Sequence, residues 1–187
     1  ALHYFPMWRT WFGLNGLCKL PWNDVEPEDN AETDEPANVP KHVQAYCDFF
    51  AGVTGRDVSP LDLITMSERV YNFQRIFNLK MGFGRRAHDV IPYRSVGPVT
   101  KEEYESRADR YDTQLKDEVG FDPAGKSTED KMAALRKWRE DRYEKLLDAV
   151  YKRRGWTENG VPTRETAKKL GIDMMPGLME LLEKHGA

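Results

Sequence analysis

The sequence predicts an all-α fold, an irregular multi-helix domain with long loops. Apolar side chains recur every three to four residues in several segments, which is the spacing of one helix face. Glycine- and proline-bearing stretches separate these segments. No part of the chain shows a convincing series of alternating apolar and polar residues, as half-exposed strands would. These observations together indicate helices packed on helices.

The first expected element is an aromatic helix. Tyr4, Trp8 and Trp11 fall at i, i+4 and i+7, and we expect Gly13 to end the helix. A short turn follows, in which Gly13 and Gly16 bring backbone close to whatever sits beside Cys18. The aromatic rings either form core or, together with Trp22, line a substrate channel. Residues 1–22 are therefore one segment, a helix and the turn that carries Cys18.

Residues 23–40 are rich in acidic residues and proline, which predicts a surface loop. The helical body, 41–187, begins with a helix over 41–52. Cys47 lies on the apolar face of this helix, where a small buried side chain is expected.

A long helix is predicted from about 60 to 79. Ser59 is a good N-cap, and Pro60 fits the first turn. Its expected apolar stripe consists of Leu61, Ile64, Val70, Phe73, Ile76 and Phe77. Residues 80–100 then form irregular backbone. Arg85 and Arg86 either bind an anionic ligand or make a structural ion pair with Asp89 or another acid, and the ion pair is the stronger interpretation.

The last third of the chain predicts three more helices. The longest runs from about 128 to 153 and follows a highly charged segment, 101–119, that begins like a helix. Its expected inward side chains are Met132, Leu135, Trp138, Leu146, Val150 and Tyr151. Thr163 caps a short helix that ends at Gly171, and an amphipathic helix follows through Leu178, Leu181 and Leu182.

Composition narrows the possible functions. The chain has 187 residues and a net charge of −3, which gives no reason to expect nucleic acid or an anionic membrane as a partner. No apolar run approaches the roughly 20 residues that cross a bilayer. Two cysteines do not make a disulfide framework, so we expect a cytoplasmic protein. The first residue is Ala, which fits a fragment, a processed chain or a cut domain.

Three segments, in order, resemble motifs of one enzyme family. Gly16-Leu17-Cys18 resembles the end of the motif D-x-x-G-L-C. The segment from Phe77 to Pro92 resembles F-N-x-R-x-G-x-x-R-x-x-D-x-x-P, and Arg153 to Thr163 resembles R-G-W-x-x-x-G-x-P-T. These are motifs of the aldehyde ferredoxin oxidoreductase family, and the resemblance covers residues from about 10 to 170. It identifies the chain as the C-terminal domain of a longer enzyme.

The resemblance also implies cofactors. Enzymes of this family hold tungsten, sometimes molybdenum, between two pyranopterins, with a 4Fe–4S cluster nearby. Cys18 matches the fourth cluster cysteine, and the other three belong to upstream domains of the same chain. The neighbouring residues Asn15, Gly16, Leu17, Cys18 and Lys19 are the expected cofactor contacts. Such clusters are usually held by four thiolates, so two cysteines alone do not hold one.

One position departs from the family pattern. The leading Asp of the first motif, which binds the pterin ring in relatives, is Gly13 here. Either Asn15 substitutes for it in part, or the pterin contact comes from elsewhere. The departure also points to a divergent branch of the family, such as the tungsten subunit of class II benzoyl-coenzyme A reductase. The expected substrate is accordingly an aldehyde or an aromatic acyl-coenzyme A. The expected partners are ferredoxin or an iron–sulfur electron-transfer subunit, in an oligomeric assembly.

The alternative hypothesis is a stand-alone helical interaction domain without a cofactor. It predicts a colourless monomer in which Cys18 is buried. Metal analysis of the full-length protein distinguishes it from the enzyme hypothesis.

Overall fold

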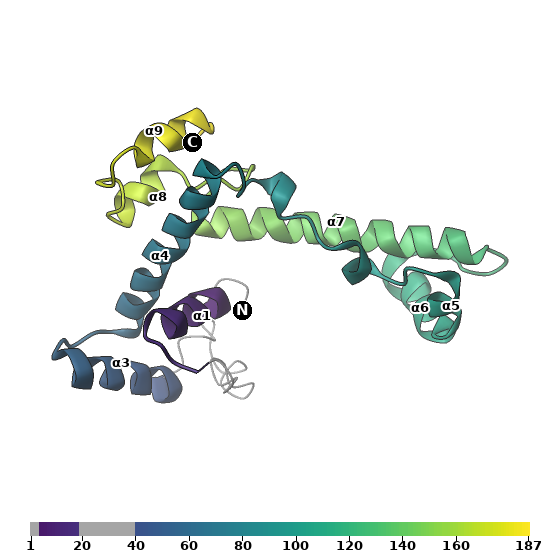
Figure 1. Ribbon diagram of the computed structural model, residues 1–187. Helices are drawn as coiled ribbons and strands as arrows, with labels where there is room; N and C mark the ends of the chain where they lie inside the picture. The colour runs from purple at the N-terminus through teal and green to yellow at the C-terminus, as the bar shows by residue number, and fades with distance from the viewer. Residues whose placement is uncertain (1–3, 19–39) are drawn as a thin grey trace. The chain divides into compact units, whose positions relative to one another are not determined.

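A computed structural model describes residues 4–18 and 40–187 (Figure 1). Within these ranges every regular element is a helix, and the only sheet-type pairing is an isolated bridge between Trp156 and Pro162. The predicted all-α class is confirmed. No helix in the described ranges combines the length and the apolar character that crossing a membrane requires.

The described residues divide into two compact units, and α7 (Thr128–Arg154) contributes to both. The first unit consists of residues 1–85 and 150–187, and the second of residues 86–149. The expected segmentation into 1–22, 23–40 and 41–187 stays a prediction, because residues 19–39 lie outside the described part.

The long helix α4 (Pro60–Lys80) is the central element of the first unit, since α1 (Tyr4–Leu14), α3 (Pro40–Thr54) and α9 (Leu178–Lys184) all contact it (Figure 1). The short helix α8 (Arg164–Lys169) contacts α9. The predicted start of α4 is confirmed as a capping box. The Ser59 hydroxyl accepts from the Asp62 backbone N–H at 3.2 Å, and the Ser59 N–H donates to the Asp62 carboxylate at 2.8 Å.

The predicted apolar stripe of α4 is partly wrong. Ile64 and Ile76 are buried as expected, but Leu61, Phe73 and Phe77 are 64%, 43% and 52% exposed. The buried face instead includes two polar residues, Ser67 and Asn72. The pattern of apolar residues therefore predicted the wrong buried face for part of α4. Polar side chains that have hydrogen-bond partners occupy some of the buried positions.

Two hydrophobic clusters stabilise the first unit. One joins α1, α3 and the first half of α4, and its buried members are Met7, Trp8, Trp11, Phe12, Val43, Cys47, Leu63 and Ile64. The other joins the second half of α4 to the C-terminal segment, through Ile76, Leu79, Val161, Ala167, Leu170, Ile172, Leu178 and Leu182.

The second unit contains five short elements and most of α7. The short elements after the 3₁₀ turn η1 (Arg86–His88) are η2 (Tyr93–Val96), α5 (Lys101–Glu105), α6 (Ala108–Gln114) and the π-turn η3 (Leu115–Val119). Its core consists of Tyr104, Tyr111, Leu115 and Leu135. Next to this core the Tyr104 hydroxyl donates to Asp112 at 2.6 Å, and the Lys131 ammonium donates to the same carboxylate at 2.8 Å.

Of the side chains expected to point inward from α7, Leu135 and Tyr151 are buried, whereas Leu146 is 43% exposed. The predicted helix itself is confirmed, as are the Thr163 cap of α8 and the final helix α9.

Candidate functional site

The turn that carries Cys18 is a helix C-cap. Gly16 has a φ of +66°, and the backbone N–H of Leu17 donates to the carbonyl oxygen of Phe12 at 2.9 Å. This is a Schellman cap, in which a glycine adopts the left-handed conformation and the next backbone N–H donates to the carbonyl oxygen five residues earlier. The expectation that Gly13 ends the helix is therefore wrong. Gly13 lies inside α1, and Gly16 supplies the left-handed conformation.

The structure brings four of the five expected cofactor contacts together at this cap. Leu17 is half-buried against the aromatic cluster of α1, and Cys18, the next residue, is exposed. The Asn15 amide nitrogen donates to the carbonyl oxygen of Trp11 at 2.9 Å, so this group already serves the helix end. Lys19 lies outside the described residues.

The two cysteines occupy opposite environments. Cys47 is 2% exposed within the α1–α3–α4 cluster, as predicted for a core residue. Burial raises the pKa of the Cys47 thiol, and the nearby Asp48 and Asp62 charges add to the effect. The thiolate is the form of cysteine that binds metals and acts as a nucleophile, so a buried thiol with a raised pKa, such as Cys47, is poorly reactive. Cys18 is the accessible sulfur. The described residues contain no group of three or more His, Cys, Asp or Glu side chains placed to hold a metal ion.

Two tryptophans of α1, Trp8 and Trp11, form core. Trp8 and Trp11 are 0% and 1% exposed, and each ring lies against Tyr46, with centroids 5.6 Å and 5.0 Å away. Such ring pairs contribute stability beyond the area they bury. Of the two interpretations, core therefore holds for Trp8 and Trp11. Trp22 lies outside the described residues.

The second motif also contains a helix C-cap. Gly82 has a φ of +91°, and the Phe83 N–H donates to the carbonyl oxygen of Asn78 at 2.8 Å, which ends α4. Two residues later, Gly84 has a φ of +79° and packs tightly on the helix. A Cβ at Gly84 would lie 3.1 Å from the carbonyl oxygen of Arg75.

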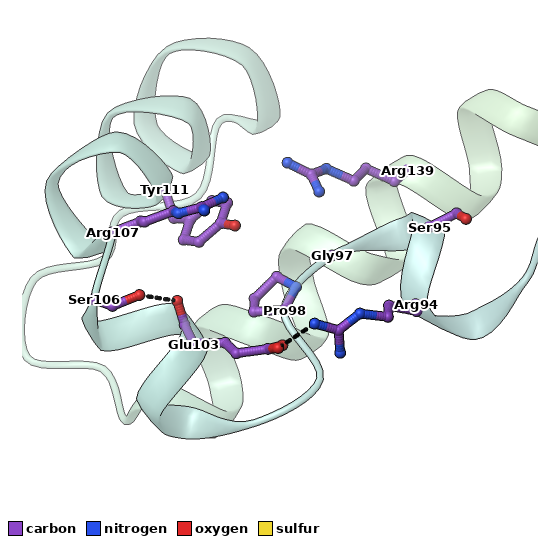
Figure 2. Close-up of a pocket in the computed structure, with 9 residues that line it drawn as sticks. All are labelled: Arg94, Ser95, Gly97, Pro98, Glu103, Ser106, Arg107, Tyr111 and Arg139. Atoms are coloured by element: carbon purple, nitrogen blue, oxygen red, sulfur yellow. Dashed lines mark hydrogen bonds and ion pairs between the residues drawn. The ribbon is translucent and has the colours of Figure 1, made fainter.

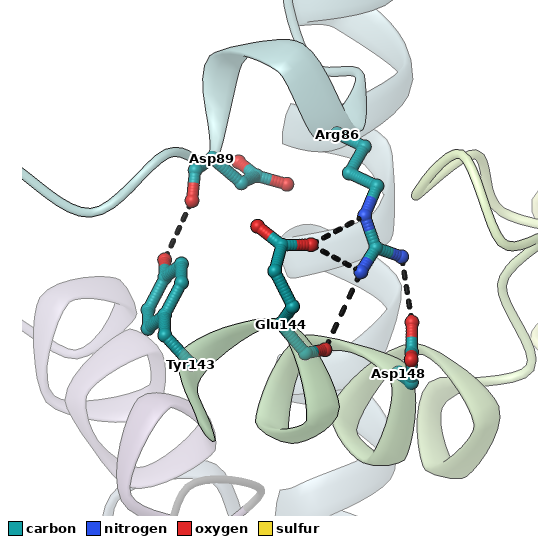
Figure 3. A network of polar contacts seen from close by, with 5 residues as sticks. All are labelled: Arg86, Asp89, Tyr143, Glu144 and Asp148. Carbon is teal, nitrogen blue, oxygen red and sulfur yellow. Dashed lines mark hydrogen bonds and ion pairs between the residues drawn. The ribbon is translucent and has the colours of Figure 1, made fainter. Parts of the chain in front are cut away.

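Arg86, from the end of this motif, makes a structural ion-pair network within the second unit (Figure 3). Its guanidinium donates to Glu144 at 2.5 Å and to Asp148 at 2.6 Å, and these acids are one turn apart on α7. Beside it, the Tyr143 hydroxyl donates to the carbonyl oxygen of Asp89 at 2.6 Å. These three contacts hold the segment around η1 to α7. The ion-pair interpretation of Arg86 is confirmed, with α7 supplying the acids.

The third motif contains a helix C-cap as well, which ends α7. Gly155 has a φ of +66°, and the Trp156 N–H donates to the carbonyl oxygen of Tyr151 at 2.9 Å. The hydroxyls of Thr163 and Thr166 both donate to the carbonyl oxygen of Gly155, at 2.9 Å and 2.7 Å. Residues 155–163 therefore form a loop tied at both ends. In all three motifs, the glycine places the chain in the left-handed conformation that ends a helix.

Side chains of α4 hold this loop from the other side. The buried Trp156 indole N–H donates to the Asn72 side-chain oxygen at 2.8 Å, and Trp156 stacks on Tyr71 with an interplanar angle of 19°. The Arg75 guanidinium lies 4.8 Å from the Trp156 ring centroid and donates to the carbonyl oxygen of Gly160 at 2.9 Å. Sequence reasoning missed Tyr71, Asn72 and Arg75. Tyr71 and Arg75 are one turn apart on α4, but this spacing does not indicate a distant partner such as Trp156.

The first and third motifs are connected through packed side chains of the first unit. Leu17 and Tyr71 both pack on the α1–α3–α4 cluster, and Tyr71 in turn stacks on Trp156. A cavity of about 420 Å³ opens beside Trp156. Its lining includes one buried residue of α1, Met7, and the basic side chains Lys152, Arg153, Arg154 and Lys169. Tyr71 thus links the cluster beneath the Cys18 turn to the Trp156 loop.

Comparisons with known proteins agree with these motifs. The family description "Aldehyde ferredoxin oxidoreductase, domains 2 & 3" matches residues 1–172. The chain is 29% identical over 127 residues to a tungsten-containing aldehyde ferredoxin oxidoreductase of Thermococcus kodakarensis. It is 28% identical over 128 residues to the protein of that name from Pyrococcus horikoshii. Each alignment covers 68% of this chain and 16% of the relative, so the chain corresponds to a small part of these proteins. No solved structure matches it significantly.

Proposed function

The chain belongs to the aldehyde ferredoxin oxidoreductase family, and on this premise we propose that it forms part of a longer tungsten-dependent oxidoreductase in which Cys18 is one thiolate ligand of a 4Fe–4S cluster. The relatives' names support tungsten at the level of the family. The remaining cluster ligands and most pterin contacts are proposed to come from upstream domains of the same chain.

The observation that carries this proposal is the position of Cys18. A cluster ligand must present its sulfur outward from a rigid support, since the other ligands come from elsewhere in the chain. The Gly16 cap fixes the backbone, Leu17 anchors it in the aromatic cluster, and Cys18 is exposed directly after that anchor. A Cβ at Gly16 would meet no atom of the described residues within 4 Å, so these residues leave space beside the turn. The residues present therefore fit a cluster at this site.

An exposed apolar stripe supports a location inside a larger enzyme. Phe73, Phe77 and Met81 follow one another at intervals of four residues along α4 and its C-cap, and they are 43%, 52% and 60% exposed. Contiguous exposed apolar side chains mark interaction surfaces. We propose that upstream domains of the same chain cover this stripe. Phe77 is also the first residue of the second motif.

The proposed reaction is a two-electron transfer at tungsten, with electrons passing through the cluster. The tungsten–pterin group supplies the redox chemistry when it is bound. In this part of the chain, Cys18 holds one corner of the cluster, and the buried rings of Trp8 and Trp11 keep water from one side of the turn. The acid–base residue at the metal is proposed to lie in the upstream domains.

The substrate class remains a choice between two branches. The names of the relatives favour an aldehyde that is oxidised to a carboxylic acid, with ferredoxin as electron acceptor. Gly13 in place of the family's pterin-binding Asp favours a divergent branch that reduces an aromatic acyl-coenzyme A through an iron–sulfur subunit. Anaerobic assays of the full-length protein decide between them, with benzaldehyde plus an oxidised dye on one side and benzoyl-coenzyme A plus a reduced dye on the other. A cytoplasmic, oligomeric enzyme is part of the same proposal.

The cluster assignment is tested in the full-length enzyme with Cys18→Ala, and Cys47→Ala is the matched control. Iron content and the brown visible absorption should fall in Cys18→Ala and persist in Cys47→Ala, while helical circular dichroism persists in both. Unchanged iron in Cys18→Ala removes the assignment. A colourless wild-type protein without iron or tungsten favours the alternative, a stand-alone helical interaction domain.

A further inference from the structure

A cleft of about 260 Å³ in the second unit is lined by three arginines, Arg94, Arg107 and Arg139 (Figure 2). Its acidic residue is Glu103, and the other lining residues are Ser95, Gly97, Pro98, Ser106 and Tyr111. The cleft lies entirely within residues 86–149 and shares no residue with the three family motifs.

One arginine of the cleft is already neutralised. Arg94 donates to the Glu103 carboxylate at 2.5 Å, and the Val99 backbone N–H donates to the same carboxylate at 2.8 Å. The bond from Val99, followed by that from Arg94, lowers the pKa of Glu103. Glu103 therefore stays ionised and is fully engaged by Arg94 and the backbone.

The other two arginines lack such a partner. Within the described residues, no carboxylate pairs with Arg107 or Arg139. Arg139 is half-buried, donates to the neutral Gln114 side chain at 2.7 Å, and lies 5.8 Å from the Tyr111 ring centroid. Figure 2 shows it extending from α7 toward Tyr111. A guanidinium cannot lose its proton in a protein, so the cleft carries excess positive charge.

The backbone keeps this cleft open and fixed. Gly97 has a φ of +147°, and a Cβ there would lie 3.5 Å from a terminal nitrogen of Arg139. A side chain at this position would be strained and would cover the guanidinium. Arg136 fixes the same segment, because it donates to the carbonyl oxygen of Tyr93 at 3.0 Å and stacks 3.6 Å from the Tyr93 ring centroid.

We propose that this cleft binds the phosphate group of a small phosphate monoester. A monoester is close to dianionic at neutral pH, which matches two guanidinium groups without carboxylate partners. Guanidinium forks bind phosphate oxygens in pairs, and Arg107 and Arg139 each bring one such fork to the cleft. The volume lies below the roughly 300–1,000 Å³ of pockets that enclose drug-sized ligands. It accommodates a phosphate and the first atoms of its ester.

The test is calorimetric titration of the full-length enzyme with glycerol 3-phosphate, inorganic phosphate and succinate. The proposal predicts that glycerol 3-phosphate binds at least as tightly as phosphate, and that succinate binds more weakly than either. Arg107→Gln should weaken glycerol 3-phosphate binding about tenfold or more, since a hydrogen bond to a charged group is lost. Arg110→Gln, an exposed residue of the same helix outside the cleft, should leave it unchanged.

Arg107→Gln is the main test variant, because Arg107 is exposed and makes no structural ion pair among the described residues. Its replacement should therefore leave the fold intact. Arg139→Gln should give the same loss, with circular dichroism confirming that it folds. The proposal is overturned if Arg107→Gln binds like Arg110→Gln, if succinate binds as tightly as glycerol 3-phosphate, or if phosphate binds and the ester does not. Iron content and cluster absorption are unaffected by these variants, so the outcome is independent of the role of Cys18.

Discussion

The backbone N–H of Leu17 donates to the carbonyl oxygen of Phe12 at 2.9 Å, and this bond closes α1 one residue before Cys18. Gly16 makes the bond possible by adopting a φ of +66°. Leu17 then packs on the aromatic cluster, while Cys18 stays exposed. The position of the thiol is therefore set by a helix end and by a hydrophobic anchor.

Replacing Gly16 with alanine should destabilise the protein by about 1–2 kcal/mol, because a left-handed conformation costs this much for an L-residue. Gly52 offers a matched control. It lies inside α3 without a positive φ, and a Cβ there would meet none of the described atoms within 4 Å. Gly52→Ala should stabilise by about 0.5–1 kcal/mol.

Urea unfolding followed by circular dichroism measures both variants. Opposite signs for Gly16→Ala and Gly52→Ala are expected. The same sign for both would contradict the description of Gly16 as the glycine that ends α1.

The choice between Gly13 and Gly16 shows what the sequence can and cannot reveal. Aromatic spacing predicted α1, and a nearby glycine predicted its end. Both glycines satisfy that rule, and only the path of the backbone after the last turn decides which one becomes left-handed. The family motif placed Cys18 correctly on this turn, but it said nothing of the Leu17 anchor.

A buried hydrogen bond, from the Trp156 indole to Asn72, gives a second prediction. Asn72→Ala leaves the indole N–H buried without a partner, and should lower the free energy of unfolding by about 1–3 kcal/mol. Asn78→Ala, an exposed position on the same helix, should change it by less than about 0.5 kcal/mol.

A double-mutant cycle isolates the bond itself. Trp156→Phe combined with Asn72→Ala should show a coupling energy of about 0.5–3 kcal/mol in urea unfolding. Strictly additive effects of the two substitutions would argue that this hydrogen bond contributes nothing to stability.

This same bond explains why the buried face of α4 was only partly predictable. Counting apolar residues favours Phe73 and Phe77, which are exposed, over Asn72, which is 5% exposed. Asn72 is buried because a tryptophan 84 residues away supplies its partner. A pattern within one helix carries no information about such a distant donor. The three arginines of the second unit escaped prediction for the same reason, since they come from three separate elements.

The Asp112 carboxylate gives a prediction for pH. Burial acts to raise its pKa, but the hydrogen bonds from Lys131 and Tyr104 outweigh burial, and the net pKa lies below the ordinary aspartate value. A carboxyl whose folded pKa is lowered contributes stability above its unfolded pKa, about 3.9. That contribution is lost as the pH falls through the lower, folded pKa.

Asp112→Asn should therefore cost about 1–3 kcal/mol at pH 7, because the amide no longer accepts from both donors. The difference from wild type should shrink as the pH falls below about 4. Urea unfolding between pH 7 and pH 3 measures it, and Asp109→Asn on the exposed side of α6 is the control. A difference that is constant over this range would refute a stabilising role for the ionised form.

The central claim, that Cys18 binds the cluster, is tested most directly by low-temperature electron paramagnetic resonance of the reduced full-length enzyme. Serine can replace thiolate with a harder oxygen ligand, so Cys18→Ser should shift the g-values of the cluster signal or abolish it. Cys47→Ser, whose side chain lies in the hydrophobic cluster, should leave the signal unchanged in whatever fraction folds. A Cys18→Ser signal identical to that of wild type, at equal iron content, would contradict the account.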